Sequence, residues 1–549
     1  MFSSISTVAR STTAARRQLN FVVGILFAFG SIVPGCGGGD DEDKKPACSP
    51  ASGDRCACDA ADATSCPGGF LCRPSGDGDA CVPEGTAGRV PSCLNADGLD
   101  VFAAEADGAL SVSWKVNGAI DSTEGFEVRY GSAAGDYNQA VTVGSEVRRA
   151  TIDPLENGTT YFVVVAALGA DGRASFVSCE LEAIPHVLAF AGDVVVNATT
   201  GGDQRSPDLA SNLDGTRLYL AWEDKGAVAL AVSTDFGDGW IATELVAASG
   251  QAPALAVRDA VIDDAGNVLR PELLYLAWED DGQIMVSSYD PAAATFSTPV
   301  GVATGTSPDV ALGLDGVHVA FADDGTIRHA ASFDGAATFG EPAAVSVGLT
   351  NARAPSVAVH PTSGDVLVAW DAIEGAGDSN VYSAVSADGG ATFGVPVRID
   401  DDPMGQNQLN VSVAADPQTG ELFASWEDRR GGANVYFATS DGGGQSWSPN
   451  VDVGAGLGGD QFHPQAVVDV ASNVYVAFQD TTDGQKVVFS RFNEEGTFDP
   501  PLAPSTKAGQ GGVVGDYPSV ATDLFGAVYV AWEENRGGPD LDVVFARAE

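Results

Sequence analysis

A repeated run of apolar residues that ends in an aromatic residue and then acids constrains the fold more than any other feature of this chain. The run occurs seven times between residues 187 and 549, with its aromatic residues 43 to 56 positions apart. Strand-like segments such as SPDLAS precede each run, and segments such as VALAVSTD follow it. Three to four strands in a unit of about 50 residues are typical of the radial sheets, or blades, of a β-propeller. The seven aromatic residues are Trp222, Trp278, Phe321, Trp370, Trp426, Phe478 and Trp532.

The two ends of this region complement each other. The last repeat stops at DVVFARAE, after its third strand, and an unassigned strand, DVVVNATT from Asp193 to Thr200, precedes the first repeat. If the early strand joins the last sheet, the ring closes and its edges are protected. Residues 187–549 are therefore predicted to form an all-β, seven-bladed propeller.

A second signature lies between the third and fourth strands of several repeats. SADGGATF from Ser386 fits the pattern S-x-D-x-G-x-T-[WF] throughout, and STDFGDGW from Ser233 fits with one change. SFDGAATF from Ser332 lacks the central glycine, and the copy from Thr439 to Trp447 has one inserted residue. These turns resemble the Asp box of the bacterial neuraminidase repeat, which occurs in sialidases and many other secreted propellers.

That resemblance implies a structural role for the four Asp-box carboxylates. They would accept backbone N–H bonds inside the turn, while the aromatic residue fills the space between blades. In related propellers these turns lie on the face opposite the active site. The predicted Asp-box residues are Asp235, Asp334, Asp388 and Asp441.

Sialidase chemistry requires residues that the sequence does not display. That family uses three arginines, a Tyr–Glu pair and an acid–base Asp, and usually carries Phe-Arg-Ile-Pro on an early strand. The nearest string here is Val397-Arg398-Ile399-Asp400, which lies too late in the chain. We therefore assign no catalytic residue, metal ligand or cofactor, and a divergent sialidase-like glycoside hydrolase is kept as the alternative.

Acids at the ends of the second strands should gather on the face opposite the Asp boxes. Such a ring could bind Ca²⁺, amines or sugar hydroxyls, with arginine orienting an anionic group. The alternative is that each acid caps its own loop while Arg430 and Arg536 pair with neighbours. The predicted ligand-binding residues are Glu223, Asp224, Glu279, Asp280, Glu427, Asp428, Arg430, Glu533, Glu534 and Arg536.

The N-terminus predicts export. Three arginines precede a 15-residue apolar run, Phe21 to Gly35, which is too short to span a bilayer but fits a signal peptide. The run ends at Val33-Pro34-Gly35-Cys36, which resembles a bacterial lipobox and implies that residues 1–35 are removed and Cys36 is lipidated. An ordinary signal peptide with an incidental cysteine is the alternative. Residues 36–47 form a predicted tether.

Residues 48–93 are predicted to be a small module held by disulfides. Six cysteines fall within 34 residues, a segment too short to build a sufficient apolar core. Six cysteines allow 15 pairings, which the sequence leaves open. A zinc site is the rival hypothesis, but the module contains no histidine. The six are Cys48, Cys56, Cys58, Cys66, Cys72 and Cys81.

Residues 94–186 alternate short apolar strands with turns, which predicts a β-sandwich. Trp114 in SVSW and the corner LENGTTY ending at Tyr161 resemble a fibronectin type III domain. The resemblance implies that Tyr161 hydrogen-bonds back across its loop and that the domain is a spacer. Cys93 and Cys179 would tie the entry of the sandwich to its last strand.

The net charge of the chain limits the classes of partner that it can bind. The chain has 28 basic residues against 75 acidic ones, a formal net charge of −47. Such a surface repels nucleic acid and anionic membranes. We therefore expect a monomeric lipoprotein at the cell exterior, attached to the membrane only through its lipid, with no bound nucleic acid. Its propeller would bind glycan or protein without catalysis; an envelope scaffold or adhesion protein is a further alternative.

Overall fold

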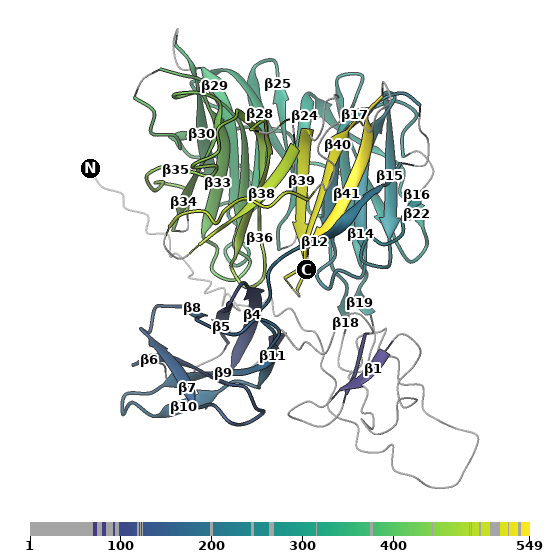
Figure 1. Cartoon of the computed structure of the whole chain (residues 1–549). Coiled ribbons are helices and arrows are strands. Elements are labelled where there is room, and N and C mark those ends of the chain that lie inside the picture. Colours follow the sequence, from purple (N-terminus) through teal and green to yellow (C-terminus); the bar gives the residue numbers. More distant parts are fainter. Residues whose placement is uncertain are drawn as a thin grey trace, which may run out of the picture.

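The computed structural model of the protein is built from β-strands. It describes residues 70–73, 80–83, 92–93 and 98–548, apart from 118–119, 121, 123, 198–200, 243–245, 263–267, 315, 374–376, 404, 442, 483, 485, 494–495, 505–515, 525 and 536–539. In these ranges the protein is all-β (Figure 1). The same ranges contain no helix that could serve as a membrane span.

Little of the region before residue 98 belongs to the described part of the chain. Strand β1 (Phe70–Arg73) pairs with β2 (Ala80–Pro83) in an antiparallel register that places Cys72 opposite Cys81. The predicted signal peptide, lipidation site and tether lie outside the described residues, as do Cys48, Cys56, Cys58 and Cys66.

The region predicted as a sandwich consists of two antiparallel sheets. One has the order β3-β4-β5-β8, and the other has the order β10-β9-β6-β7 with β11 also paired to β9. The strands are β3 (Ser92–Cys93), β4 (Leu99–Ala106), β5 (Ala109–Val116), β6 (Gly125–Gly131), β7 (Gln139–Val143), β8 (Arg149–Ile152), β9 (Tyr161–Leu168), β10 (Ala174–Val177) and β11 (Leu181–Ala183).

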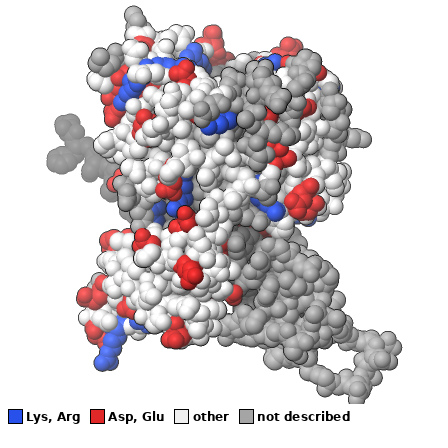
Figure 2. Space-filling view, viewed as in Figure 1, with Lys and Arg blue, Asp and Glu red and all other residues white. Residues whose placement is uncertain are grey.

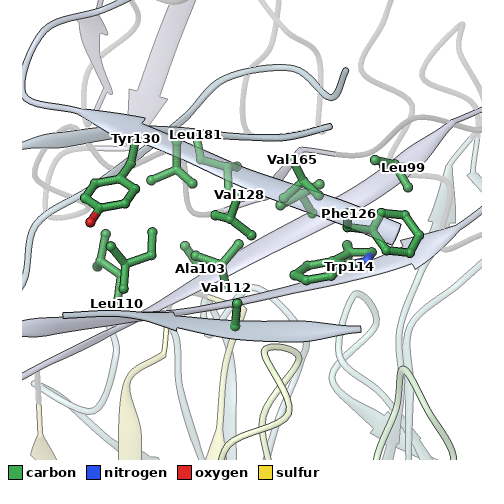
Figure 3. Packing of buried hydrophobic residues seen from close by; sticks show 14 of the residues in the cluster. Leu99, Ala103, Leu110, Val112, Trp114, Phe126, Val128, Tyr130, Val165 and Leu181 are labelled. Atoms are coloured by element: carbon green, nitrogen blue, oxygen red, sulfur yellow. The ribbon is translucent and has the colours of Figure 1, made fainter. Parts of the chain in front are cut away.

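Alternating residues of both sheets form one shared core (Figure 3). The Trp114 ring on β5 lies 5.3 Å from the Phe126 ring on β6, and both side chains are buried. The corner before β9 is held by a hydrogen bond in which the Glu156 backbone N–H donates to Tyr161 Oη at 3.1 Å. Cys179 is disulfide-bonded. The Cys93 side chain lies outside the described residues.

Seven antiparallel sheets follow along the chain. The first three consist of β13 (Gln204–Ser211), β14 (Leu218–Asp224), β15 (Ala227–Ser233) and β16 (Ile241–Ala242); β17 (Gln251–Arg258), β20 (Leu273–Asp280), β21 (Gln283–Asp290), β22 (Thr295–Phe296) and β23 (Val300–Thr304); and β24 (Thr306–Leu312), β25 (Val317–Asp323), β26 (Thr326–Ser332) and β27 (Ala343–Ala344). A separate hairpin, β18 (Val261–Ile262) and β19 (Val268–Arg270), is inserted in the second sheet.

The next two sheets have the same four-strand order and the sixth has three strands. They consist of β28 (Thr350–Val359), β29 (Val366–Ile373), β30 (Ser379–Ser386) and β31 (Val397–Arg398); β32 (Gln408–Ala415), β33 (Leu422–Asp428), β34 (Asn434–Ser440) and β35 (Val451–Asp452); and β36 (Gln461–Val468), β37 (Val474–Asp480) and β38 (Lys486–Phe492).

The seventh sheet joins the two ends of the region. Its order is β12-β41-β40-β39, so the strand before the first repeat lies beside the last strand of the chain. Asp193 is opposite Ala546 and Val195 is opposite Val544 in this pairing. The strands are β12 (Phe190–Val195), β39 (Asp516–Thr522), β40 (Val528–Glu534) and β41 (Asp542–Ala548).

The first strands of neighbouring sheets contact one another in chain order, and β39 of the seventh sheet contacts β13 of the first. A recurring hydrogen bond accompanies these contacts: a side chain on one first strand accepts a backbone N–H from the next. The contact between the second and third sheets lacks this hydrogen bond, because the equivalent residue of the second sheet, Ala254, has no side-chain acceptor. The pairs are Leu209 N to Ser519 Oγ (2.8 Å), Leu255 N to Asp208 Oδ2 (2.6 Å), Val357 N to Asp309 Oδ2 (2.7 Å), Val413 N to Ser356 Oγ (3.2 Å), Ala466 N to Ser412 Oγ (3.1 Å) and Val520 N to Gln465 Oε1 (2.6 Å).

Asp309, a buried acceptor in one of these hydrogen bonds between first strands, should make the stability of the protein depend on pH. Desolvation between the packed strands raises the pKa of Asp309 to about 7, opposed by the N–H of Val357 and reinforced by nearby Asp208. A raised folded-state pKa contributes stability that is complete below the unfolded value of about 4 and is lost as pH rises through about 7. We expect Asp309→Asn to raise Tm relative to wild type at pH 8 and less at pH 5, measured by differential scanning fluorimetry. Exposed Asp238→Asn is the control; an equal gain at both pH values would contradict the account.

The sandwich packs directly against the seven-sheet body (Figure 1). Leu99, Val101 and Ala103 of β4 face the sandwich core, whereas Phe102 and Ala104 contact Val470 and Ala471 in the turn after β36. Leu213 and Leu524, in two other turns of the body, join this cluster. The guanidinium of Arg149 also donates to the Ser472 carbonyl at 3.0 Å. Strand β4 is therefore buried on both faces.

Loss of this contact should separate the two parts without unfolding either. We expect Phe102→Ser to increase the radius of gyration in small-angle X-ray scattering, since it removes the largest apolar side chain of the joint cluster. Val177→Ser, at an exposed apolar residue of the other sandwich sheet, should leave it unchanged. An unchanged radius of gyration for both variants would show that Phe102 does not hold the two parts together.

Candidate functional site

The seven-sheet body has two unlike faces. In each sheet the turns after the first and third strands lie at one edge, and the turn after the second strand lies at the other. The first-to-second turns contact the sandwich, so we call that side the lower face and the opposite side the upper face (Figure 1).

The Asp-box turns lie on the lower face and are held by their own carboxylates. Asp388 accepts the N–H of Thr392 at 2.8 Å, and Asp334 accepts that of Thr338 at 2.9 Å. Asp235 accepts the N–H of Gly239 at 2.8 Å. Hydrogen bonds inside the turns lower the pKa of Asp334 and of Asp388 to about 2. Asp441 is an exposed turn residue.

The aromatic residues of these turns pack against hydrophobic clusters that neighbouring sheets share. The Trp240 ring of the first sheet lies 5.0 Å from the Phe545 ring of the seventh. Phe339, Phe393 and Trp447 pack at the corresponding places of the third, fourth and fifth sheets. The turns therefore contribute contacts between neighbouring sheets.

Every first strand begins with a β-bulge at the upper face. In each sheet the register against the second strand shifts by one residue at this point. A non-glycine residue with positive φ occupies the bulge, a conformation that costs free energy and that bulges use to redirect a side chain. These bulge residues are Ser206, Ala252, Ser307, Ala354, Asn410, His463 and Tyr517.

Two acids of the predicted ligand-binding set each accept the backbone N–H of a bulge residue in the next sheet. Glu427 accepts from His463 at 3.0 Å, and Glu533 accepts from Ser206 at 3.0 Å. Asp371, from the same position of the fourth sheet, accepts from Asn410. Glu427 and Glu533 are almost completely buried. These acids hold the start of the neighbouring sheet, which is a longer-range role than capping their own loops.

Arg430 and Asp428 form a second, internal group. Asp428 is fully buried and accepts from the Arg430 Nε at 2.9 Å, the Arg430 backbone N–H and the Trp426 indole N–H. The Arg430 guanidinium also pairs with Asp401 and stacks over Tyr436, 4.5 Å from the ring centre. Both side chains thus form hydrogen bonds and ion pairs with other residues of the protein next to the end of β33.

The other predicted ligand residues occupy varied surroundings. Glu534 is buried and accepts the Trp532 indole N–H at 3.0 Å. Asp224 accepts from Gln204, and Asp280 from Ser249. Burial raises the pKa of Glu223, an effect opposed by Arg205. Glu279 is half-buried, and Arg536 lies outside the described residues.

Arginines on the upper face are paired with acids. Arg205 binds Asp203 at 2.6 Å, Arg353 binds Asp371 at 2.7 Å and Arg429 binds Glu427 at 2.9 Å. Burial raises the pKa of Asp371, and Arg353 opposes that shift. Figure 2 shows basic and acidic side chains close together along the upper edge of the molecule. Each of these three described arginines therefore has an acidic partner of its own.

An aromatic group lies where the fifth, sixth and seventh sheets meet. The rings of His463 and Tyr517 stack, with centroids 4.0 Å apart and an interplanar angle of 17°. Arg429 lies over the Phe462 ring at 5.1 Å. Tyr517 leaves 45% of its surface exposed. The site residues predicted from sequence do not include this group. A signal for the bulges exists, because a proline follows the bulge residue in every first strand except that of Asn410.

A polar hollow of about 570 Å³ opens on the same face between the second, third and fourth sheets. Its lining includes Thr306, Asp323, Asp324, Asn351 and Arg353. In the residues that the structure describes, no three His, Cys, Asp or Glu side chains gather as metal ligands. The upper face therefore offers an aromatic surface on one side and a polar hollow on the other.

Comparison with known proteins yields structural likenesses alone. No family model and no curated protein matches the chain. A protein of unknown function from Dyadobacter fermentans is 16% identical over 66% of this chain and 99% of its own, with a TM-score of 0.44. A leech intramolecular trans-sialidase is 12% identical over 83% of this chain and 92% of its own, with a TM-score of 0.36. The Hadza microbial sialidase Hz136 is 15% identical over 84% of this chain and 95% of its own, with a TM-score of 0.38. At these TM-scores the likenesses carry no argument about chemistry.

Proposed function

We propose that this chain is an exported surface lipoprotein in which a seven-bladed β-propeller binds carbohydrate or protein without catalysis. Its seven sheets would be the blades, with β12 closing the ring. The inner hydrogen bonds support closure, because the bond from Leu209 to Ser519 joins the first sheet to the seventh.

The sandwich would be a fibronectin type III-like domain that serves as a pedestal. The hydrogen bond between Glu156 and Tyr161 at its corner and the buried Trp114 support this assignment. Because the sandwich contacts the lower face, it would leave the upper face pointing away from the lipid anchor on Cys36. The proposed partner is an extracellular glycan or protein, met by a monomer whose only membrane contact is the lipid.

The proposal that the protein is not catalytic is supported by the hydrogen bonds that carboxylates on the upper face accept from the protein itself. A glycoside hydrolase needs carboxyl groups or a nucleophile that can reach the substrate. Glu427, Asp428 and Glu533 are buried and accept hydrogen bonds from the protein itself. These three carboxylates thus have hydrogen-bond partners within the protein.

A glycan array probed with the purified mature chain, with and without Ca²⁺, tests this function. We expect protein to be retained on a subset of glycans and those glycans to stay intact. Loss of terminal sugars would make the propeller a hydrolase. Absence of both retention and trimming would overturn carbohydrate binding and leave a protein partner, which capture from intact cells would identify. Ca²⁺-dependent retention would support a ligand-binding role for the half-buried acids Asp224 and Asp280.

A further inference from the structure

The seven bulge positions at the upper face are equivalent in backbone but not in side chain. Those of the first four sheets carry only serine or alanine, whereas the fifth, sixth and seventh carry Asn410, His463 and Tyr517. Because neighbouring first strands contact one another, these three residues form one continuous arc. The ring of first strands therefore has one side of small residues and one side of large polar and aromatic residues.

The arc holds its rings in place. A left-handed backbone conformation is unfavourable for a bulky residue such as Tyr517, which has a φ of 46°, or His463, which has a φ of 48°. Stacking at 4.0 Å orders the two rings against each other. The N–H bond from His463 to Glu427 fixes the backbone below them. Strained residues of this kind cluster at ligand-contacting sites.

Groups that can hydrogen-bond surround these rings. Glu427 accepts from the Asn410 amide at 2.8 Å and from Arg429 at 2.9 Å, which places both donors beside the His463 backbone. The amide and guanidinium carry further N–H donors that Glu427 alone does not use. An exposed ring with polar groups at its edge suits a ligand that has one apolar face and a rim of hydroxyls.

Charge selects among such ligands. The nearby arginines are already paired with carboxylates, and the chain as a whole carries a formal charge of −47. A carboxylated sugar would meet this field without a dedicated cation and would be disfavoured.

We propose that Tyr517, stacked on His463, is the platform for one sugar ring of a saccharide that lacks a carboxylate. This inference rests on the proposed carbohydrate-binding function and specifies its site and its ligand class. Asn410 and Arg429 contact the hydroxyl rim of the same sugar.

The test is isothermal titration of the mature chain with matched oligosaccharides that end in galactose, N-acetylglucosamine, glucosamine, glucuronate or sialate. We expect the uncharged and amine-bearing ligands to bind more tightly than the two carboxylated ones. Tyr517→Ala should weaken binding about tenfold, equivalent to about 1.4 kcal/mol. Tyr517→Phe, which keeps the ring, should bind like the wild type.

Phe333→Ala is the matched control, because Phe333 is an exposed aromatic residue (65%) in an Asp-box turn of the lower face. It should leave affinity unchanged, and all variants should keep the wild-type Tm. If the wild type binds a saccharide and Tyr517→Ala binds it equally well, the inference fails while the proposed function stands. Tighter binding of glucuronate or sialate would likewise overturn it. No binding of any of these saccharides by the wild type would overturn the inference together with the carbohydrate-binding part of the proposed function.

Discussion

Asp428→Ala should lower the free energy of unfolding by about 3 kcal/mol. Removing one partner of a buried ion pair leaves the other charge poorly compensated and costs about 3–5 kcal/mol. The lower end applies because Arg430 keeps Asp401 and has 21% of its side chain exposed. The Trp426 indole N–H would lose its acceptor as well. Urea unfolding followed by tryptophan fluorescence measures the change.

The control for this variant is Asp280→Ala. Asp280 occupies the same strand position in the second sheet but is half-buried and accepts from Ser249, so its loss should cost less than about 1 kcal/mol. If Asp428→Ala were as stable as Asp280→Ala but lost glycan binding, Asp428 would be a ligand residue. That result would support the ligand-binding role predicted from sequence over a structural role for Asp428.

Replacement of β12 (Phe190–Val195) by a Gly-Ser segment of equal length should destabilise the seven-sheet body more strongly. The change removes the strand pairing with β41 and the Phe190 ring, which lies 5.3 Å from Phe489 of the sixth sheet. Loss of a packed aromatic side chain and its ladder bonds should cost on the order of 5 kcal/mol. It would also expose β41 as an unpaired edge, which favours aggregation.

Limited proteolysis and thermal unfolding would measure this effect. We expect early cleavage near β39 to β41 and a clear fall in Tm. Replacing the exposed strand β19 (Val268–Arg270) in the same way should change neither. Equal stability of the β12 variant and the wild type would mean that the ring does not depend on its N-terminal strand.

Much of the fold could be predicted from sequence because its signals are local and repeated. The aromatic–acid runs lie in the second strand of each of the seven sheets, as in LYLAWED before Lys225 and VYVAWEE before Asn535. The pairing of β12 with β41 agrees with the missing strand of the last repeat. Turn chemistry likewise placed Asp334 and Asp388, whose partners lie four residues away.

The site was harder to predict because its determinants are bonds between distant residues. Glu427 and His463 are 36 positions apart, and Glu533 and Ser206 are 327 positions apart. A strand-end acid that binds a ligand and one that binds the next sheet have the same local sequence. A proline directly after the bulge residue marks six of the seven bulges in the sequence, but the left-handed backbone of that residue depends on the opposing strand.

The most direct test of binding without turnover is the recovery of a bound saccharide. A neutral oligosaccharide that the mature chain retains would be incubated with it at equal concentration, eluted and measured by mass spectrometry. The account predicts saturable binding and recovery of the ligand at its original mass, with affinity reduced in Tyr517→Ala. Recovery of shortened products that the wild type forms would contradict it, because the protein would then be a hydrolase.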